Sequence, residues 1–166
     1  MIKERVNKGM IAQKCWKIII ANTVPDKIIP ATPEEDRKQH WDYMLNGRKK
    51  DIKNNYFYDY KNRVCVVFEL WTVNGENGSL FGMADDLVFQ ISGESSVHDI
   101  DNIRFLEIPR LSCVQYHINK TSCRMVDNKI YAVNHCFKSE REYECNDLLT
   151  AIPVDDIINL GKIIKL

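Results

Sequence analysis

The sequence YFYDYKNRVCVVFELWTV, residues 56–73, has the pattern of a β-hairpin. Tyr56, Tyr58 and Tyr60 alternate with other residues, and a tight turn is expected near Lys61-Asn62. The second half, residues 64–71, is apolar on both of its alternating faces. A strand that is apolar on both faces is typical of the interior of a sheet. Residues 64–71 are therefore predicted to form a central strand, and the rest of the fold is built around it.

Short segments rich in β-branched and aromatic residues recur on both sides of this hairpin and are bounded by turn residues. Strands are expected at residues 14–20, 103–108, 148–152 and 162–166, and in the run 111–137. Residues 80–92 fit either a strand or a helical turn, and residues 154–160 fit a short helix. Because strands outnumber helices, the sequence predicts an α+β fold with a mostly antiparallel sheet.

The strongest helix pattern covers residues 33–46. Thr32 is a good N-cap, Pro33 suits the first helical position, and Glu35 completes a Thr-x-x-Glu capping box. Gly47 is expected to end the helix in the left-handed conformation. The apolar face is narrow, which predicts one clear helix packed on the sheet and half exposed to water.

Length and composition indicate one globular domain covering residues 1–166. The chain has 166 residues, 45% of them hydrophobic and 28% charged, with a net charge of zero. The charge is uneven: residues 1–63 hold 14 Lys/Arg and 8 Asp/Glu (+6), whereas residues 64–166 hold 9 and 15 (−6). Such asymmetry either favours a basic surface for an acidic partner or averages out where the halves interleave.

The sequence has no pattern of a signal peptide and no run of about 18 apolar residues. These features predict an intracellular, cytoplasmic protein that does not act at a membrane. Six cysteines in that compartment are expected to be reduced.

Residues 111–137 (LSCVQYHINKTSCRMVDNKIYAVNHCF) concentrate cysteine and histidine. A zinc site from Cys113, His117, Cys123 and His135 is one hypothesis, and a nucleophilic pair of Cys123 with His135 is another. Both depend on the hairpin register: Cys123 faces Asn134 across a two-residue turn and Val133 across a three-residue loop. The competing interpretation is that these are core residues, so no cofactor is favoured and zinc is the one candidate.

Residues 48–63 (RKKDIKNNYFYDYKNR) combine six Lys/Arg and two Asp with interleaved aromatic residues. Cations that contact phosphates beside rings that stack on bases are typical of single-strand nucleic-acid binders. Tyrosine is also a frequent anchor in protein interfaces, and the same residues could simply pack across strands. The predicted partner-binding residues are Arg48, Lys49, Lys50, Lys53, Tyr56, Tyr58, Tyr60, Lys61 and Arg63.

The carboxylate pairs Asp85-Asp86 and Asp155-Asp156 are weaker candidates for Mg²⁺ binding, because adjacent side chains point in different directions. The sequence therefore favours a small binding protein that acts through a macromolecular partner, with an inhibitor or immunity protein as one form. The partner is expected to be a protein, with nucleic acid as the second choice. The alternatives are an enzyme acting on nucleic acid or nucleotides through a Cys/His/Asp site, and a zinc-binding module.

Overall fold

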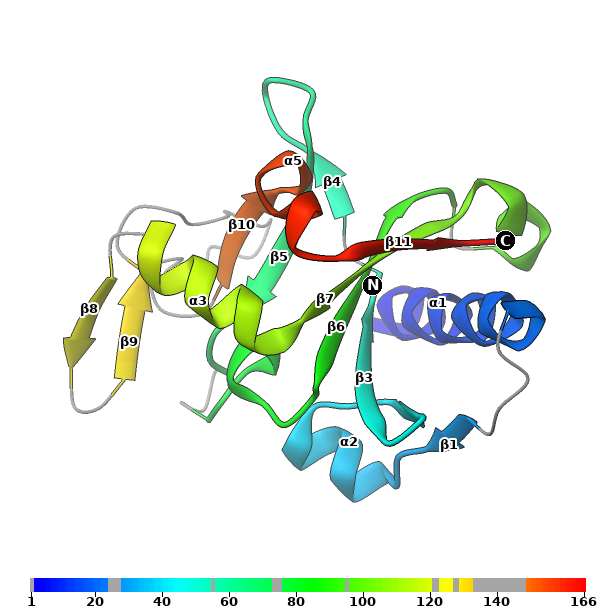
Figure 1. Cartoon of the computed structure of the whole chain (residues 1–166), viewed down its shortest axis with the longest axis horizontal. Helices are drawn as coiled ribbons and strands as arrows, with labels where there is room; N and C mark the ends of the chain where they lie inside the picture. Colours follow the sequence, from blue (N-terminus) through cyan, green and yellow to red (C-terminus); the bar gives the residue numbers. More distant parts are fainter. Residues whose placement is uncertain are drawn as a thin grey trace.

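The computed structural model of the chain describes residues 2–23, 28–54, 56–72, 76–94, 96–120, 123–126, 129–132 and 149–166. Its elements are arranged as an α+β fold, as the sequence predicts (Figure 1). The helices are α1 (Ile2–Thr23), α2 (Pro33–Gln39), α3 (Arg110–Lys120) and α5 (Val154–Ile157), with short 3-10 turns η1 (Ser79–Phe81), η2 (Val97–Asn102) and η3 (Ile158–Leu160).

Six strands form the main sheet, in the order β1-β2-β3-β6-β7-β11. They are β1 (Ile28–Pro30), β2 (Tyr43–Leu45), β3 (Arg48–Lys53), β6 (Asp86–Ser92), β7 (Arg104–Pro109) and β11 (Lys162–Lys165). The β3–β6 pair is parallel and the other neighbours are antiparallel. The sheet is therefore mixed and mostly antiparallel.

The hairpin predicted within residues 56–73 forms over residues 56–69. β4 (Tyr56–Tyr58) and β5 (Val64–Glu69) pair antiparallel, and β5 lies centrally between β4 and β10 (Leu149–Pro153). Asp59 Oδ1 accepts hydrogen bonds from the backbone amides of Lys61 and Arg63, both at 2.9 Å, and these bonds close the turn. Asn62 takes the left-handed conformation there, with φ 58°.

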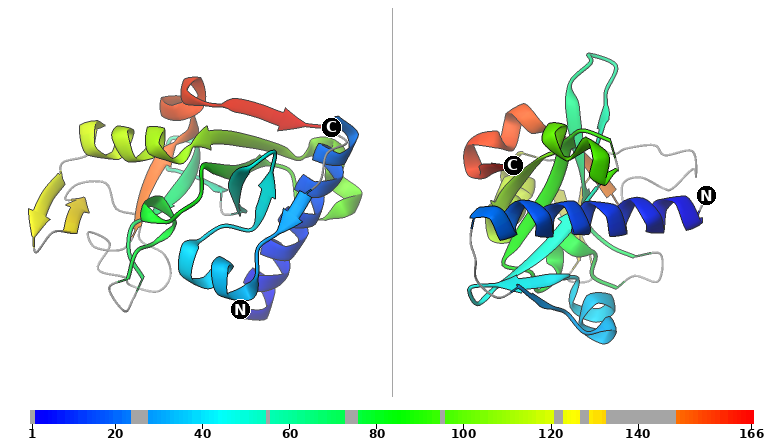
Figure 2. Two further views of the ribbon diagram at one scale, coloured as in Figure 1. Left: turned by 60° about the horizontal axis from the view of Figure 1, so that its bottom comes forward. Right: turned by 90° about the vertical axis from the view of Figure 1, so that its right-hand side faces the viewer.

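Helix α1 covers one face of the six-stranded sheet (Figure 2). Its buried residues are Ala12, Cys15, Trp16, Ile19 and Ile20, which recur at helical spacing. They pack on Leu45, Ile52, Val88, Ile103 and Phe105 of the sheet side. The prediction of a strand at residues 14–20 is therefore wrong, because the run of isoleucines conceals a spacing of three and four residues.

The second face of the sheet packs against the three-stranded sheet. Phe68 of β5 stacks on Phe89 of β6, with ring centroids 5.8 Å apart. Leu106 and Ile108 of β7, Cys113 of α3 and Ile157 of α5 belong to the same core. The six-stranded sheet is thus the middle layer, with α1 on one side and β5, α3 and α5 on the other (Figure 1).

Helix α2 begins as predicted and ends early. Thr32 and Glu35 form the reciprocal capping box, with bonds of 3.1 and 3.2 Å. The helix stops at Gln39 because His40 takes the left-handed conformation, so its predicted extent to residue 46 is wrong. Asn46 and Gly47, with φ of 52° and 77°, instead form the β2–β3 turn. Two consecutive positive φ values suit Asn-Gly in a two-residue hairpin.

The strands predicted at the start of residues 111–137 are wrong, since residues 110–120 form α3. Further along, β8 (Cys123–Val126) pairs with β9 (Lys129–Ala132). Cys123 lies opposite Ala132, which differs from both predicted registers. Val126 pairs with Lys129, so the register is shifted by two residues from the two-residue-turn prediction and by one from the three-residue-loop prediction.

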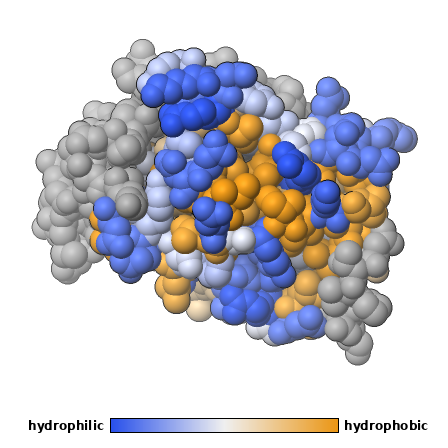
Figure 3. Space-filling view, turned by 45° about the horizontal axis from the view of Figure 1, so that its top comes forward, coloured by the Kyte–Doolittle hydropathy of each residue, from blue (hydrophilic) through white to orange (hydrophobic). Residues whose placement is uncertain are grey.

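The C-terminal segment follows the prediction: a strand (β10), a short helix (α5) and a last strand (β11). Some apolar side chains reach the surface, and Figure 3 shows one face where hydrophobic residues are bordered by hydrophilic ones. Large apolar residues that are exposed include Met10, Leu111, Leu160 and Leu166. Among the described helices, none combines the length and apolar character needed to cross a membrane.

Candidate functional site

Two of the predicted zinc ligands, Cys113 and His117, lie one turn apart on α3, and both are fully buried. His117 packs edge-on against Phe81, with ring centroids 6.4 Å apart. Burial raises the pKa of the Cys113 thiol to about 12. A thiol that is protonated at neutral pH is neither a good nucleophile nor a ready metal ligand. Cys113 and His117 therefore act as core residues in this fold.

The other two predicted zinc ligands, the side chains of Cys123 and His135, lie outside the described residues, so the Cys123–His135 pair stays a prediction. Within the described ranges, no group of three or more His, Cys, Asp or Glu residues is arranged to hold a metal ion. Cys15, Cys65 and Cys113 are free thiols in the interior. Burial also raises the pKa of Cys15 and Cys65.

Four of the six cations of the basic aromatic stretch 48–63 pair with acidic side chains: Arg48, Lys50, Lys53 and Arg63. Lys50, 5% exposed, donates to Asp86 at 2.6 Å and to Glu107 at 2.9 Å. Arg48 forms a two-pronged pair with Asp86, at 2.8 and 2.9 Å. Burial alone would raise the pKa of Asp86, but Arg48 and Lys50 lower it. Arg48 and Lys50 therefore neutralise buried acids, a role that the sequence does not reveal because β3 is not apparent in it.

The exposed part of the same stretch is the β4–β5 turn, which projects from the body of the molecule (Figure 1). Tyr60 is 90% exposed and Tyr58 is 59% exposed. Lys61 lies over the Tyr60 ring at 5.6 Å, while Arg63 pairs with Asp59 at 2.8 Å. We call Tyr58, Tyr60 and Lys61 the hairpin tip. Of the remaining predicted residues, Tyr56 bonds to the Gly93 carbonyl at 2.7 Å and Lys49 lies over Trp41 at 5.3 Å.

The predicted carboxylate pairs have structural partners. Asp85 Oδ2 accepts the Lys49 amide at 2.8 Å, and Asp86 belongs to the ion pairs above. Asp155 and Asp156 lie in the first turn of α5, as the sequence predicts, and Asp156 accepts the Tyr116 hydroxyl at 3.2 Å. Neither pair forms a site of its own.

A different acidic pair, Asp42 and Asp51, is brought together at the edge of β3. The Asp42 amide donates to the Lys50 carbonyl at 2.7 Å, and the Asp42 carboxylate accepts the Ile52 amide at 2.7 Å. Asp42 is thus bonded to the residues on either side of Asp51. Its second oxygen accepts the Gln13 amide of α1 at 3.1 Å. This arrangement fixes Asp42 beside the partner strand at the point where β2 begins.

Asp51 is nearly enclosed, at 4% exposure, and its Oδ2 accepts no hydrogen bond. The Lys53 ammonium lies 3.2 Å from that oxygen and forms an ion pair with it. Lys53 also lies 3.7 Å from Glu69 of β5. The side chains of Lys53 and Glu69 are 26% and 42% exposed, so solvent reaches this set of charged residues at Lys53 and Glu69. We call Asp42, Asp51 and Lys53 the acid–lysine cluster.

Electrostatics within this cluster favour protonated acids. Burial, and next the charge of Asp51, raise the pKa of Asp42 to about 7. Burial also raises the pKa of Asp51, against the attraction of Lys53. Burial alone would lower the pKa of Lys53, but Asp51, Glu69 and Asp42 raise it, so Lys53 stays charged. When both carboxylates ionise, they place two negative charges beside one fixed cation, and a further cation would compensate the excess.

The raised pKa of Asp42 makes stability depend on pH. An acid whose pKa rises from 3.8 to about 7 on folding holds its proton more tightly in the folded state. Its contribution therefore decreases as pH rises from about 4 to about 7 and stays unfavourable above that range. We expect Asp42→Asn to be more stable than wild type at about pH 8, by on the order of 1–3 kcal/mol.

Urea unfolding of both proteins, with EDTA present, measures this difference. The advantage of Asp42→Asn is expected to shrink at about pH 5, where Asp42 of the wild type is protonated. Any loss from the altered bond to Gln13 is present at both pH values and cancels in the comparison. A stability difference that is the same at both pH values would contradict the raised pKa.

The acid–lysine cluster was missed by sequence reasoning, although a weak signal exists. Asp51 and Lys53 alternate with Ile52, so on a strand both side chains lie on one face. Recognising this requires placing a strand at residues 48–53, where three consecutive cations and an aspartate hide the apolar pattern. Asp42 is nine residues upstream, and only the tight Asn46-Gly47 turn brings it back alongside Asp51.

The chain matches no protein-family model, and no significant match was found among curated proteins or solved structures. The functional argument therefore rests on the acid–lysine cluster, the hairpin tip and the surfaces near them.

Proposed function

We propose that the protein is a Mg²⁺-dependent phosphodiesterase acting on nucleic acid, with the acid–lysine cluster as its catalytic centre. This proposal develops the enzyme alternative predicted from the sequence and places it on Asp42, Asp51 and Lys53 in place of Cys and His. The observation that carries it is the enclosed Asp51 carboxylate, paired with Lys53 at 3.2 Å and lying near the second carboxylate of Asp42.

The alternative interpretation of the cluster is a buried ion pair that serves the fold. An ion pair that only served the fold would be expected to balance its charges, as Lys50, Asp86 and Glu107 do with Arg48 and Lys162. Around Lys53, three carboxylates raise its pKa, those of Asp51, Glu69 and Asp42. Strongly shifted pKa values of this kind are more common at functional sites than elsewhere.

Magnesium fits this donor set. Mg²⁺ is commonly held by one or two carboxylates together with water and substrate phosphate oxygens, so it does not need a closed protein cage. Asp42 and Asp51 would supply the carboxylates, and substrate would supply further oxygens. The absence of a larger ligand group within the described ranges is compatible with such an open site.

The reaction follows from these roles. A divalent cation held by Asp42 and Asp51 would supply a water of lowered pKa as the nucleophile toward phosphorus, and the proton of that water would pass to solvent. One P–O bond forms and the ester P–O bond to the leaving oxygen breaks. That oxygen takes a proton from water, which leaves a phosphate monoester and a free hydroxyl. Lys53, held charged by its acidic neighbours, stabilises the negative charge that develops on the phosphoryl oxygens.

Nucleic acid is the preferred substrate class because α1, whose Gln13 is bonded to Asp42, exposes the cations Lys14 and Lys17 next to it. The test is incubation of purified protein with single-stranded and duplex DNA and RNA, with Mg²⁺ or with EDTA. The proposal requires cleavage of at least one of these substrates that depends on Mg²⁺ and stops with EDTA. Intact substrates under all conditions would refute it.

A second candidate function, binding of a protein partner, is supported by the exposed rings of the hairpin tip. Rigid, exposed tyrosines are frequent anchors at interfaces. We expect the triple change Tyr58→Ser, Tyr60→Ser and Lys61→Gln to weaken capture of such a partner by about 10-fold or more, without altering the thermal unfolding temperature. Lys50 is excluded from this test because it is buried.

The measurement is affinity capture from cell extract followed by quantification of proteins that co-purify with wild type. Matched changes at exposed Arg37 and Lys38 of α2 control for loss of surface charge. Equal recovery of the same partner by wild type and the triple variant would exclude the hairpin tip as its binding surface.

A further inference from the structure

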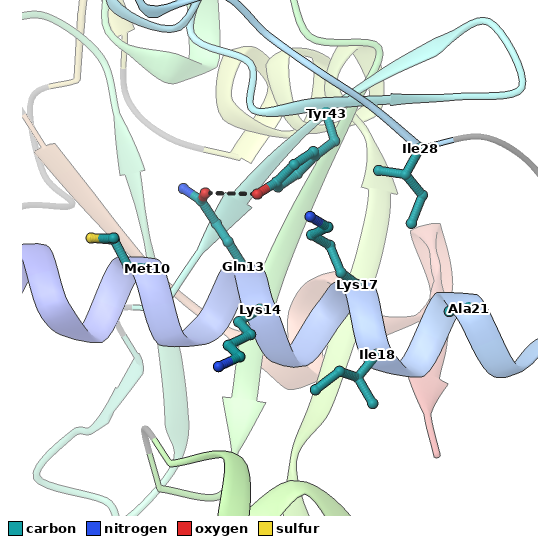
Figure 4. A pocket seen from close by; sticks show the side chains of 8 residues that line it. All are labelled: Met10, Gln13, Lys14, Lys17, Ile18, Ala21, Ile28 and Tyr43. Carbon is teal, nitrogen blue, oxygen red and sulfur yellow. Dashed lines mark hydrogen bonds between the residues drawn. The ribbon is translucent and has the colours of Figure 1, made fainter.

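A shallow groove of about 490 Å³ runs along the exposed side of α1 (Figure 4). One side of the groove is a helical stripe that includes Met10, Lys14, Ile18 and Ala21. The opposite border is formed by Tyr43 of β2 and Ile28 of β1. From residue 10 to residue 21 the groove follows about 16 Å of helix, at 1.5 Å per residue.

The groove leads to the acid–lysine cluster through a chain of hydrogen bonds. The Tyr43 hydroxyl donates to Gln13 Oε1 at 3.4 Å, and Gln13 Nε2 donates to Asp42 Oδ1 at 3.1 Å. Tyr43 and Gln13 line the groove, so a ligand lying in it passes within one side chain of Asp42. Figure 4 shows Gln13 and Lys17 extending from α1 toward Tyr43.

The lining of the groove suits a ligand that carries negative charge and has flat apolar parts. None of its eight described lining residues is acidic, and two are exposed lysines, Lys14 and Lys17. Lys17 lies over the Tyr43 ring at 5.2 Å, whereas Lys14 extends from the other side of α1, away from Tyr43 (Figure 4). Between the charges, the remaining lining is mainly apolar. Phosphates would meet the lysines, and unpaired bases would cover the apolar surface.

We infer that this α1 groove binds a single strand of nucleic acid on the α1 face of the sheet, next to Asp42 of the acid–lysine cluster. Asp51 and Lys53 lie on the opposite face, beside β5. The inference rests on the proposed function, since it names the substrate form and its binding surface. At 3.4 Å per nucleotide, about five stacked nucleotides match the 16 Å length. A duplex would present phosphates to Lys14 and Lys17 but would leave the apolar lining of the groove unused, because its bases are paired and stacked inside.

The experiment measures binding of a fluorescein-labelled DNA oligonucleotide of about 12 nucleotides by anisotropy, in EDTA so that cleavage cannot occur. Wild type is expected to bind the single strand at least about 10-fold more tightly than the matching duplex. The double change Lys14→Gln and Lys17→Gln is expected to raise the dissociation constant for the single strand at least about 10-fold at low salt. It should also reduce the slope of log affinity against log salt by about 1.4, at about 0.7 per phosphate contact.

Two further variants keep the result interpretable. Ala21→Glu places a negative charge in the groove at an exposed helical position and is expected to weaken binding as well. The matched double change Arg37→Gln and Lys38→Gln removes two exposed cations from α2 and is expected to change the affinity less than about twofold. Single-strand affinity that is unchanged in both groove variants, or equal affinity of wild type for the duplex, would overturn the inference.

Failure of the groove can be distinguished from failure of the catalytic proposal. Binding is measured in EDTA and cleavage with Mg²⁺, so the two results are obtained independently. If wild type cleaves nucleic acid with Mg²⁺ and the groove variants bind it as tightly as wild type, the catalytic centre is supported and the groove is excluded as the binding site. If the groove variants lose binding but wild type cleaves no substrate, the catalytic proposal is excluded and the groove is supported as a binding site.

Discussion

Replacing Asp51 by asparagine is expected to reduce Mg²⁺-dependent cleavage of nucleic acid by at least about 10²-fold. The proposed metal is held by Asp42 and Asp51, and loss of one carboxylate removes several kcal/mol of charge stabilisation from the transition state. Folding should survive the change, because burial already favours the uncharged form of Asp51 and Lys53 keeps its contact with Glu69. Single-turnover cleavage rates with saturating protein provide the measurement.

Lys53→Met separates metal binding from charge stabilisation in the same assay. Lys53 faces Asp51 at 3.2 Å but donates no proton in the proposed reaction. Its loss is expected to lower the cleavage rate by about 10²–10³-fold, as for other fixed donors to a developing charge. Mn²⁺ affinity should be retained or increased, because a competing cation is gone. Cleavage at the wild-type rate in either variant would exclude the acid–lysine cluster as the catalytic centre.

The second large effect is expected at Lys50. Lys50→Met should destabilise the fold by about 3 kcal/mol or more, because it leaves Asp86 and Glu107 enclosed with less positive charge beside them. Arg48 still contacts Asp86 at 2.8 Å, and Lys162 still contacts Glu107 at 3.2 Å. The loss of stability is therefore expected at the lower end of the range for breaking a buried ion pair. Urea unfolding monitored by tryptophan fluorescence measures the change.

Lys49 offers a matched control on the same strand. Its side chain lies over Trp41 at the surface of the sheet, and Lys49→Met should cost less than about 1 kcal/mol. Adding Asp86→Asn and Glu107→Gln to Lys50→Met should recover part of the lost stability, since the unpaired charges are removed. Equal unfolding midpoints for Lys50→Met and Lys49→Met would show that the buried ion pairs do not support the fold.

Local sequence patterns predicted those parts of the fold that depend on neighbouring residues. The capping box at Thr32 and the turn at Asp59 are local hydrogen-bond motifs, and both formed as expected. The central position of β5 followed from its two apolar faces. The predictions for residues 14–20 and for the end of α2 were wrong because tertiary packing determines both. Trp16 and Ile19 of α1 are buried against the sheet, and Trp41 packs into the core after α2 has ended.

The candidate site was harder to predict because it is assembled from separate elements. Asp42 precedes β2, Asp51 and Lys53 are on β3, Glu69 ends β5, and Gln13 comes from α1. No local sequence motif predicts that these residues lie close together. The cysteines and histidines drew attention through their clustering in sequence, yet Cys113 and His117 turned out to be interior residues of α3.

Titration of wild type and variants with Mn²⁺ by isothermal calorimetry tests the acid–lysine cluster most directly, at about pH 7.5 and without nucleic acid. The account predicts that wild type binds Mn²⁺, that Asp42→Asn and Asp51→Asn each lose at least about 10-fold in affinity, and that Glu34→Gln on α2 binds like wild type. Absence of Mn²⁺ binding by wild type, or unchanged affinity in both aspartate variants, would contradict it.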